Sequence, residues 1–150
     1  MLQNKNPFWK TGEVYVNFNL FVLLLQNIFL ILQKLEKLMD TKPRFDVLFL
    51  KDAAEFLLSL DVKVRAKIQF NIFKSQREND IELFKKISDS IWEFRTRYNG
   101  MTYRLLAFWD KERKSMVVAT HGFEKKTQKT PSKEIRKAEE IMKMYYNKNN

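Results

Sequence analysis

After residue 43 the hydrophobic and polar positions follow periods that predict regular secondary structure. The segment "RFDVLFL" (44–50) alternates and then becomes continuously apolar, which is typical of a strand. "KDAAEFLLSL" (51–60) predicts a short helix. Asp61 is placed to cap a second helix over 62–78, whose apolar residues recur at helical spacing: Val64, Ile68 and Ile72. "DIELFKKI" (80–87) then reads as a short helical or irregular link.

Three strands are predicted next, over 91–97, 102–109 and 116–123. The first two flank Asn99-Gly100, a strong hairpin signal, because a type I′ turn needs positive φ at both central positions. The polar loop "DKERKS" separates the second strand from the third. This order of segments predicts a three-stranded meander.

A final helix is predicted to begin at "TPSKEI", where Thr130 is a candidate N-cap and Pro131 suits the first helical position. Its apolar face consists of Ile135, Ala138, Met142 and Tyr145. The predicted fold class is therefore α+β, with one domain over 43–150. It combines a small antiparallel sheet, made of the N-terminal strand and the meander, with two N-terminal helices and a C-terminal helix.

Residues 1–42 form a separate N-terminal extension in this interpretation. "NLFVLLLQNIFLIL" (19–32) is strongly apolar but short for a membrane span, and Gln26 and Asn27 interrupt it. Three interpretations stay open. Residues 14–32 could be an amphipathic or partner-binding helix, or a marginal membrane anchor, or the working protein could start at Met39.

Charge narrows the functional classes. The chain has 150 residues and a net charge of +10, and residues 93–150 carry 14 basic against 7 acidic side chains. Such an excess favours a polyanionic partner, either nucleic acid or an anionic membrane surface. The chain has no cysteine, which excludes disulfides and thiolate metal sites. A single histidine without cysteine also argues against a structural zinc site. We expect no metal and no cofactor.

The predicted hairpin makes a specific statement about arginines. If Asn99 and Gly100 form a two-residue loop, Arg95 lies directly opposite Arg104 on one face of the sheet, and Arg97 joins them. Two like charges in direct register are destabilising unless an anion or a carboxylate lies between them. A phosphate between the two arginines would offset their repulsion, and Glu93, which shares the face, would neutralise part of it. The simpler alternative is that the arginines are solvated on an exposed face of the sheet.

The end of the third strand is also basic. His121 ends that strand, and Lys125, Lys126 and Lys129 follow it. A lone histidine is more often a packed residue than a catalyst, and a lysine run is more often a solvated connector. The predicted sheet order nevertheless brings this strand end beside 102–109, so these lysines could converge with the arginines.

The absence of other catalytic motifs narrows the possible reaction types. The sequence has no cysteine nucleophile, no acidic pair at metal-ligand spacing and no glycine-rich phosphate loop. A cationic cluster without metal suits RNA cleavage by the RNA's own 2′-hydroxyl, in which the protein fixes the geometry, stabilises charge on the phosphorane and assists proton transfer.

The motif blocks "IWEFRTRYNGMTYRLLAFWD" and "HGFEKKTQKTPSKEIRKAEE", with the helical stretch around "FLLSLDVKVRAKI", resemble the RelE/HigB superfamily of toxins, in its phage-derived HigB-like branch. The resemblance covers roughly 44–146. It implies a type II toxin–antitoxin toxin that is a metal-independent endoribonuclease, an mRNA interferase acting on the translating ribosome in the cytoplasm. It also implies a cognate antitoxin with a helix-turn-helix DNA-binding domain.

Carried onto this sequence, the resemblance implies a catalytic set and a set that contacts RNA. The expected catalytic residues are Arg95, Arg104, His121 and Lys126. The expected RNA-binding residues are Lys85, Arg97, Lys125, Gln128 and Lys129. Two alternatives remain: a non-catalytic nucleic-acid-binding module that uses the same basic face, and a basic membrane-associated protein anchored by residues 14–32.

Overall fold

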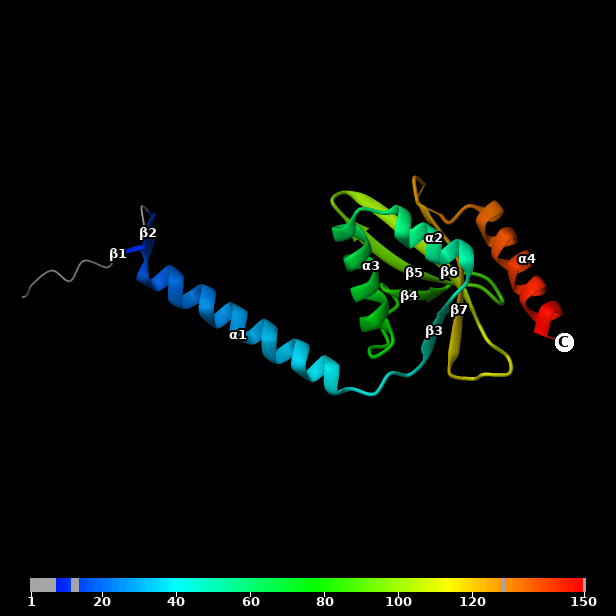
Figure 1. Ribbon diagram of the computed structural model, residues 1–150, viewed down its shortest axis with the longest axis horizontal. Helices are drawn as coiled ribbons and strands as arrows, with labels where there is room; N and C mark the ends of the chain where they lie inside the picture. Colours follow the sequence, from blue (N-terminus) through cyan, green and yellow to red (C-terminus); the bar gives the residue numbers. More distant parts are fainter. Residues whose placement is uncertain (1–7, 12–13, 128, 150) are drawn as a thin grey trace, which may run out of the picture. The chain divides into compact units, whose positions relative to one another are not determined.

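The computed structural model describes residues 8–11, 14–127 and 129–149. The chain divides into two compact units, the first ending at Thr41 and the second comprising Lys42–Asn150 (Figure 1). The first unit contains β1 (Phe8–Thr11), β2 (Val14–Asn17) and α1 (Phe18–Asp40), and its two strands pair antiparallel. No helix in the described part of the chain combines the length and the apolar character needed to cross a membrane.

The second unit is built on a five-stranded sheet with the order β3-β7-β6-β5-β4. The α+β fold class is thereby confirmed, but the sheet is mixed, because β3 runs parallel to β7 while every other pair is antiparallel. The strands are β3 (Asp46–Phe49), β4 (Phe84–Lys86), β5 (Trp92–Tyr98), β6 (Met101–Trp109) and β7 (Met116–Glu124).

β4 corrects the interpretation of 80–87 as a helical or irregular link. Its three residues pair antiparallel with β5, and Lys85 lies opposite Glu93. A strand of three residues is too short to show the alternation from which strands are recognised in a sequence. Phe84 is its buried member, and its ring stacks on that of Phe94 at a centroid distance of 4.4 Å.

Three helices cover the sheet: α2 (Lys51–Ser59), α3 (Val62–Ser75) and α4 (Ser132–Asn149). The predicted cap of α3 is confirmed, since the Asp61 carboxylate accepts a hydrogen bond from the Lys63 amide at 2.9 Å. α4 begins one residue later than expected, because the Pro131 carbonyl accepts the first helical hydrogen bonds. Thr130 therefore does not cap this helix, and its hydroxyl points to the sheet instead.

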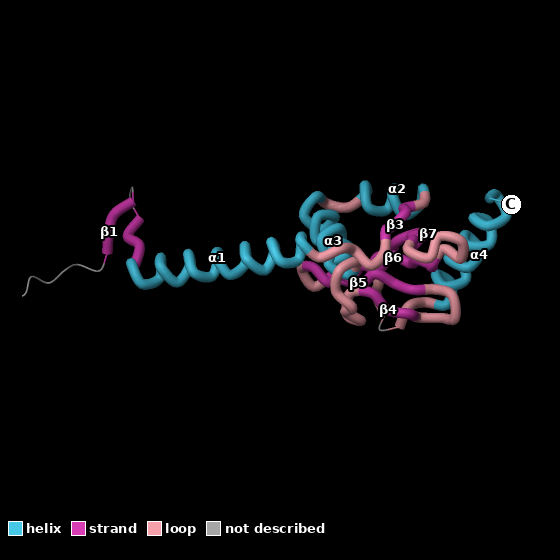
Figure 2. Tube along the Cα trace, turned by 90° about the horizontal axis from the view of Figure 1, so that it is seen from below, coloured by secondary structure: helices cyan, strands magenta, loops and turns pink. Residues whose placement is uncertain are grey.

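The sheet lies between two helical layers (Figures 1 and 2). On one face, α2 and α3 pack through Leu57, Ile68 and Ile72 against residues of the sheet that include Phe94 and Leu105. On the other face, α4 packs through Ala138 against a second cluster made of Ile91, Leu106, Phe108 and Val118. We call these the α2–α3 face and the α4 face.

The hairpin and one bulge determine which side chains reach the α4 face. Asn99 and Gly100 have φ values of 48° and 75°, as a type I′ turn requires. Arg95 consequently lies opposite Arg104, which confirms the predicted register. Between β6 and β7 the register shifts after Leu106, and this bulge brings His121 opposite Leu106, onto the α4 face.

Candidate functional site

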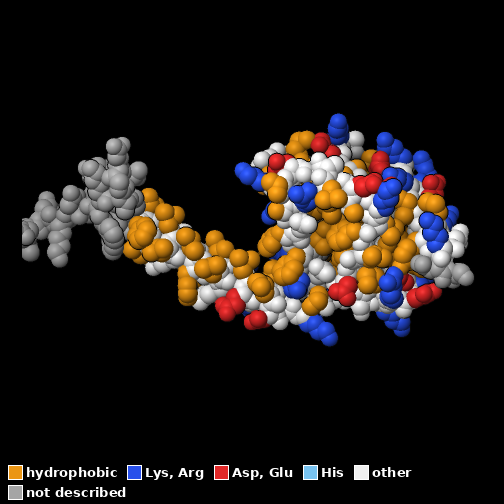
Figure 3. Space-filling view, viewed as in Figure 1, with side chains coloured by type: hydrophobic (Ala, Val, Ile, Leu, Met, Phe, Trp, Pro, Cys, Tyr) orange, Lys and Arg blue, Asp and Glu red, His pale blue; other side chains and the backbone are white. Residues whose placement is uncertain are grey.

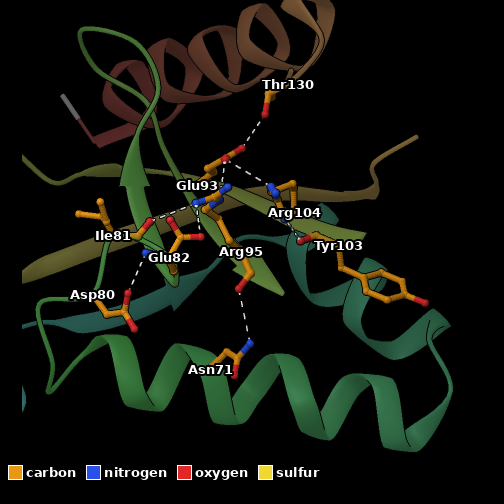
Figure 4. A network of polar contacts seen from close by, with 9 residues as sticks. All are labelled: Asn71, Asp80, Ile81, Glu82, Glu93, Arg95, Tyr103, Arg104 and Thr130. Carbon is orange, nitrogen blue, oxygen red and sulfur yellow. Dashed lines mark hydrogen bonds and ion pairs between the residues drawn. The ribbon is translucent and has the colours of Figure 1, made fainter. Parts of the chain in front are cut away.

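Arg95 and Arg104 lie side by side on the α4 face, beyond the N-terminal end of α4 (Figure 4). They alternate along their strands with Phe94 and Leu105, which point to the opposite face and belong to its core. This alternation is why the two guanidinium groups share one face of the sheet. The hairpin turn thus fixes the pair, and the buried neighbours on both strands hold it in place.

A carboxylate lies between the two arginines. Oε1 of Glu93 is 3.4 Å from Nε of Arg95 and 3.3 Å from Nε of Arg104, and the Glu93 side chain is only 4% exposed. Its other oxygen accepts a hydrogen bond of 2.6 Å from the Thr130 hydroxyl. Glu93 is therefore the internal counter-charge that a like-charged cross-strand pair requires. We call Glu93, Arg95, Arg104 and Thr130 the Glu93 cluster.

The arginines keep hydrogen-bonding capacity that the protein does not use fully. Among the described residues, Nε of Arg95 and Nε of Arg104 find no aligned hydrogen-bond acceptor, although both lie within ion-pair distance of Glu93. Nη1 of Arg95 donates to the Ile81 carbonyl and the Glu82 carboxylate, and Nη1 of Arg104 donates to the Tyr103 carbonyl. A guanidinium has five N–H donors, so donors remain for an incoming anion.

The cluster carries excess positive charge. Arg104 is 3% exposed, and burial lowers its pKa, with Glu93 opposing that change and Arg95 and Arg97 adding to it. Arginine remains protonated even so. Glu82 partners Arg95 at 3.2 Å, but its side chain is 76% exposed and the pair is screened by water. One buried carboxylate thus faces two guanidinium groups, and Arg97 adds a further positive charge that acts on Arg104, an arrangement that attracts an anion.

Two adjoining clefts open at these residues, and Arg95 lines both. The larger, of about 420 Å³, is lined by Glu93 and Thr130 together with the basic side chains of Lys85, Lys86, Lys125 and Lys129. The smaller, of about 190 Å³, is lined by Arg97 and Arg104 beside Asn71 and Glu82. The structure therefore brings together six residues expected at the site: Lys85, Arg95, Arg97, Arg104, Lys125 and Lys129.

This environment also changes the acidity of Lys125. Its backbone amide donates to the Thr102 carbonyl, which fixes it at the end of β7 beside β6. Burial lowers the pKa of Lys125, and the charges of Arg104, Arg95 and Arg97 lower it further against the opposing effect of Glu93. A lysine with a lowered pKa is a better acid than an ordinary lysine and can take part in proton transfer at a phosphate.

His121 lies elsewhere on the same face, under α4. Its Nε2 is 3.0 Å from a Glu134 carboxylate oxygen, and its Nδ1 is 3.1 Å from the Thr120 hydroxyl. The residue is 3% exposed, and burial lowers its pKa, with the Glu134 hydrogen bond opposing that change. His121 lines neither of the two clefts. Its contacts connect β7 to α4.

Two expected residues are not placed at the clefts. Lys126 is exposed and lines neither cleft, and Gln128 lies outside the described residues. Within the part of the chain that the structure describes, no group of three histidine, cysteine or acidic side chains is arranged to hold a metal ion.

Sequence reasoning missed several side chains of the site: Asn71 and Lys86, which line the clefts, and Glu82 and Thr130, which contact Arg95 and Glu93. Glu82 belongs to the segment interpreted as a link, and no periodic signal marks it as a neighbour of Arg95. Thr130 carried a cap signal, which hid its bond to Glu93. Both contacts span more than ten residues of sequence, and they arise from the pairing of β4 with β5 and from the packing of α4 against the sheet.

The candidate site lies within the part of the chain that matches a known protein family. The family model described as "Phage derived protein Gp49-like (DUF891)" matches residues 55–143, more than half of the chain and including both arginines. This match confirms the phage-derived branch that the motif blocks indicate. No curated protein matches the chain.

Two solved structures are similar in part. The first is a toxin–antitoxin complex, RelBE2 from Mycobacterium tuberculosis: 21% identity, 56% of this chain and 100% of that chain covered, TM-score 0.44. The second is a mutant of the E. coli toxin RelE in the free state: 18% identity, 54% and 82% covered, TM-score 0.44.

Proposed function

Because the chain belongs to the phage-derived Gp49-like family, we propose that it is the toxin of a type II toxin–antitoxin system and cleaves mRNA on the translating ribosome. The observation that carries this proposal is the Glu93 cluster, in which two guanidinium groups lie in direct register and Arg95 also lines a cleft with four lysines. Guanidinium groups match phosphate oxygens in geometry and charge, so the cluster suits a phosphodiester.

The RNA supplies the nucleophile in this proposal. A bond forms from the ribose 2′-oxygen to phosphorus while the bond from phosphorus to the 5′-oxygen breaks, which leaves a cyclic phosphate and a 5′-hydroxyl. The proton of the 2′-hydroxyl passes to water, and the 5′-oxygen takes a proton from the enzyme. Arg95 and Arg104 stabilise the negative charge that develops on the phosphorane oxygens.

Lys125 is the proposed donor of that proton. It lines the same cleft as Arg95, and its lowered pKa makes it a stronger acid than an ordinary lysine. Lys85, Arg97 and Lys129 are proposed to hold neighbouring phosphates, and Lys126 adds a cation outside the clefts. His121 is proposed to position α4 through Glu134, because both of its ring nitrogens already have partners within the protein.

Glu93 is proposed to hold the arginines ready for the substrate. Because each Nε already lies within ion-pair distance of the same carboxylate oxygen, each guanidinium loses less conformational freedom when a phosphate arrives. The bond from Thr130 ties this carboxylate to the start of α4. The family resemblance further supports a cognate antitoxin with a helix-turn-helix domain as the partner, in the cytoplasm.

The proposal is tested by expressing the protein and mapping cleavage in translated mRNA by primer extension. The wild type is expected to arrest growth and to cut within translated regions, and Arg104→Ala is expected to do neither. Arg65→Ala is the matched control, since Arg65 lies on α3, on the opposite face of the sheet, where it donates to the Leu58 carbonyl. It is expected to behave as the wild type.

Intact mRNA in cells that express the wild type would contradict the proposal, as would equal cleavage by the wild type and Arg104→Ala. Binding to RNA that weakens steeply with salt, without cleavage in any ribosomal preparation, would favour the non-catalytic nucleic-acid-binding module instead. Circular dichroism of both variants separates a loss of function from a loss of folding.

A further inference from the structure

Arg95 contacts two carboxylates, and the protein holds one of them much more firmly than the other. Glu93 is buried, and its second oxygen accepts the hydrogen bond from Thr130. Glu82 lies 3.2 Å from Nη1 of Arg95, and its side chain is 76% exposed. Figure 4 shows the Glu82 carboxylate beside the Arg95 guanidinium. The proposed ribonuclease function gives Glu93 a role and leaves Glu82 without one.

The turn before β4 sets the position of Glu82. The Asp80 carboxylate accepts a hydrogen bond from the Glu82 amide at 2.8 Å, and the Asp80 carbonyl accepts from the amides of Leu83 and Phe84. The Leu83 carbonyl in turn accepts from the Arg95 amide at 2.8 Å. The backbone of Glu82 is therefore held next to Arg95, while most of its side chain is in contact with water.

An exposed carboxylate at this place competes with an incoming anion for the same donor. Glu82 lines the smaller cleft together with Arg95, Arg97 and Arg104. A phosphate that approaches Nη1 of Arg95 meets a group of like charge that already accepts from it. Because an exposed ion pair contributes little to stability, this contact breaks easily and the Glu82 side chain can turn into water.

We propose that Glu82 is an internal competitor of the phosphate, an inference that rests on the proposed function because that function puts a phosphate at Arg95. In the protein without RNA, the Glu82 carboxylate occupies Nη1 of Arg95, and it leaves this donor when a phosphate binds. An RNA strand that also contacts Lys85 and Lys129 in the larger cleft has several contacts with which to displace Glu82. A single phosphate has no such further contacts and binds weakly.

The first test measures how tightly the full chain binds inorganic phosphate, in a titration followed by NMR. Glu82→Gln keeps the size of the side chain and removes its charge, so it is expected to bind phosphate about two- to fivefold more tightly than the wild type, the factor that corresponds to one exposed ion pair. A short oligothymidylate, which has phosphodiesters but no 2′-hydroxyl and is not cleaved, is expected to show the same gain. A gain with inorganic phosphate alone would contradict competition with a nucleic-acid strand.

The matched control is Glu55→Gln, which makes the same change in net charge away from the clefts. Such a control is needed because basic side chains are spread over the second unit with acidic ones among them, as Figure 3 shows, so the loss of any carboxylate adds to the attraction for anions. Glu55 is 62% exposed, pairs with Lys51 at 3.8 Å on α2 and lines neither cleft. It is expected to bind phosphate as the wild type does. Equal gains in both variants would assign the effect to net charge and overturn the inference.

The second test asks whether the gain depends on Arg95. Arg95→Ala removes the donor for which the carboxylate and the phosphate compete, so adding Glu82→Gln to this variant is expected to give a smaller gain than in the wild type. An equal gain with and without Arg95 would contradict competition at this side chain. Circular dichroism of each variant identifies any loss of folding.

The direction of the effect separates competition from support. If Glu82 instead held Arg95 in place for the substrate, Glu82→Gln would bind phosphate more weakly than the wild type, and the inference would be overturned. These binding measurements do not depend on cleavage. A wild type that leaves mRNA intact would contradict the proposed ribonuclease, whereas a wild type that cleaves mRNA, with phosphate binding unchanged in Glu82→Gln, would contradict the competitor alone.

Discussion

Two buried carboxylates, Glu93 on β5 and Asp110 directly after β6, each lie beside arginine, and they differ in how completely the protein supplies their hydrogen bonds. Asp110 has all of its hydrogen bonds supplied by the protein. One oxygen accepts from the amides of Glu112 and Arg113, and the other accepts from Nε of Arg113 at 2.9 Å and from the Tyr145 hydroxyl at 2.8 Å. These bonds hold the pKa of Asp110 at about 2, against the opposing effect of burial.

Glu93 is satisfied less completely and is outnumbered. It accepts one short bond from Thr130, while its other oxygen lies between two guanidinium groups without an aligned hydrogen bond to either Nε. The Asp110 cluster (Asp110, Arg113 and Tyr145) joins the β6–β7 loop to the C-terminal part of α4, and the protein supplies hydrogen bonds to both oxygens of its carboxylate. The Glu93 cluster has donors and positive charge left over, which is what a site for an anion requires.

The largest expected effect concerns the shape of the cation in each cluster. Arg104→Lys keeps the charge but loses the planar fork, so mRNA cleavage is expected to fall by about 10³-fold, which is the scale for removing one donor to a developing oxyanion. Arg113→Lys makes the same change in the Asp110 cluster and is expected to leave cleavage within about twofold of the wild type. Equal losses of mRNA cleavage in the two variants would contradict the functional distinction between the clusters.

The next effect is on stability and compares the two carboxylates directly. Glu93→Gln leaves Arg104 buried without a counter-charge, so the free energy of unfolding, measured in urea, is expected to fall by about 3 kcal/mol. Asp110→Asn keeps part of its hydrogen bonding and is expected to cost about 1–2 kcal/mol. Inorganic phosphate is expected to restore stability to Glu93→Gln and not to Asp110→Asn. Restoration of both variants, or of neither, would contradict an anion site at the arginines.

The smallest effect concerns His121, which connects β7 to α4. Burial lowers its pKa in the folded protein, so as the pH falls below about 6.5 the unfolded chain binds a proton before the folded protein does. The free energy of unfolding is therefore expected to decrease between pH 7 and pH 5, and this decrease is expected to be smaller in His121→Gln. Among the charges that act on this ring, Glu134 and Asp52 raise its pKa and Lys137 lowers it. If the free energy of unfolding of the variant depends on pH as that of the wild type does, the structural role assigned to His121 is contradicted.

The sequence by itself determined the arginine pair. Asn99 and Gly100 are the residues that a type I′ turn favours, and a two-residue turn leaves a single register for the strands it joins. The two-residue alternation then put Glu93 on the same face as Arg95 and Arg104. These features are local, because they depend on residues within one hairpin. The cap at Asp61 was predictable for the same reason.

The tertiary structure decided which other side chains share the site. A bulge after Leu106 sets where His121 lies on β7, and the pairing of β4 brings Lys85 opposite Glu93. The packing of α4 brings the Thr130 hydroxyl to the same carboxylate. Each of these contacts joins segments that are distant in sequence, and its formation depends on how the layers pack rather than on any local residue preference. Local chemistry therefore specified the cations, and packing specified the cleft in which they converge.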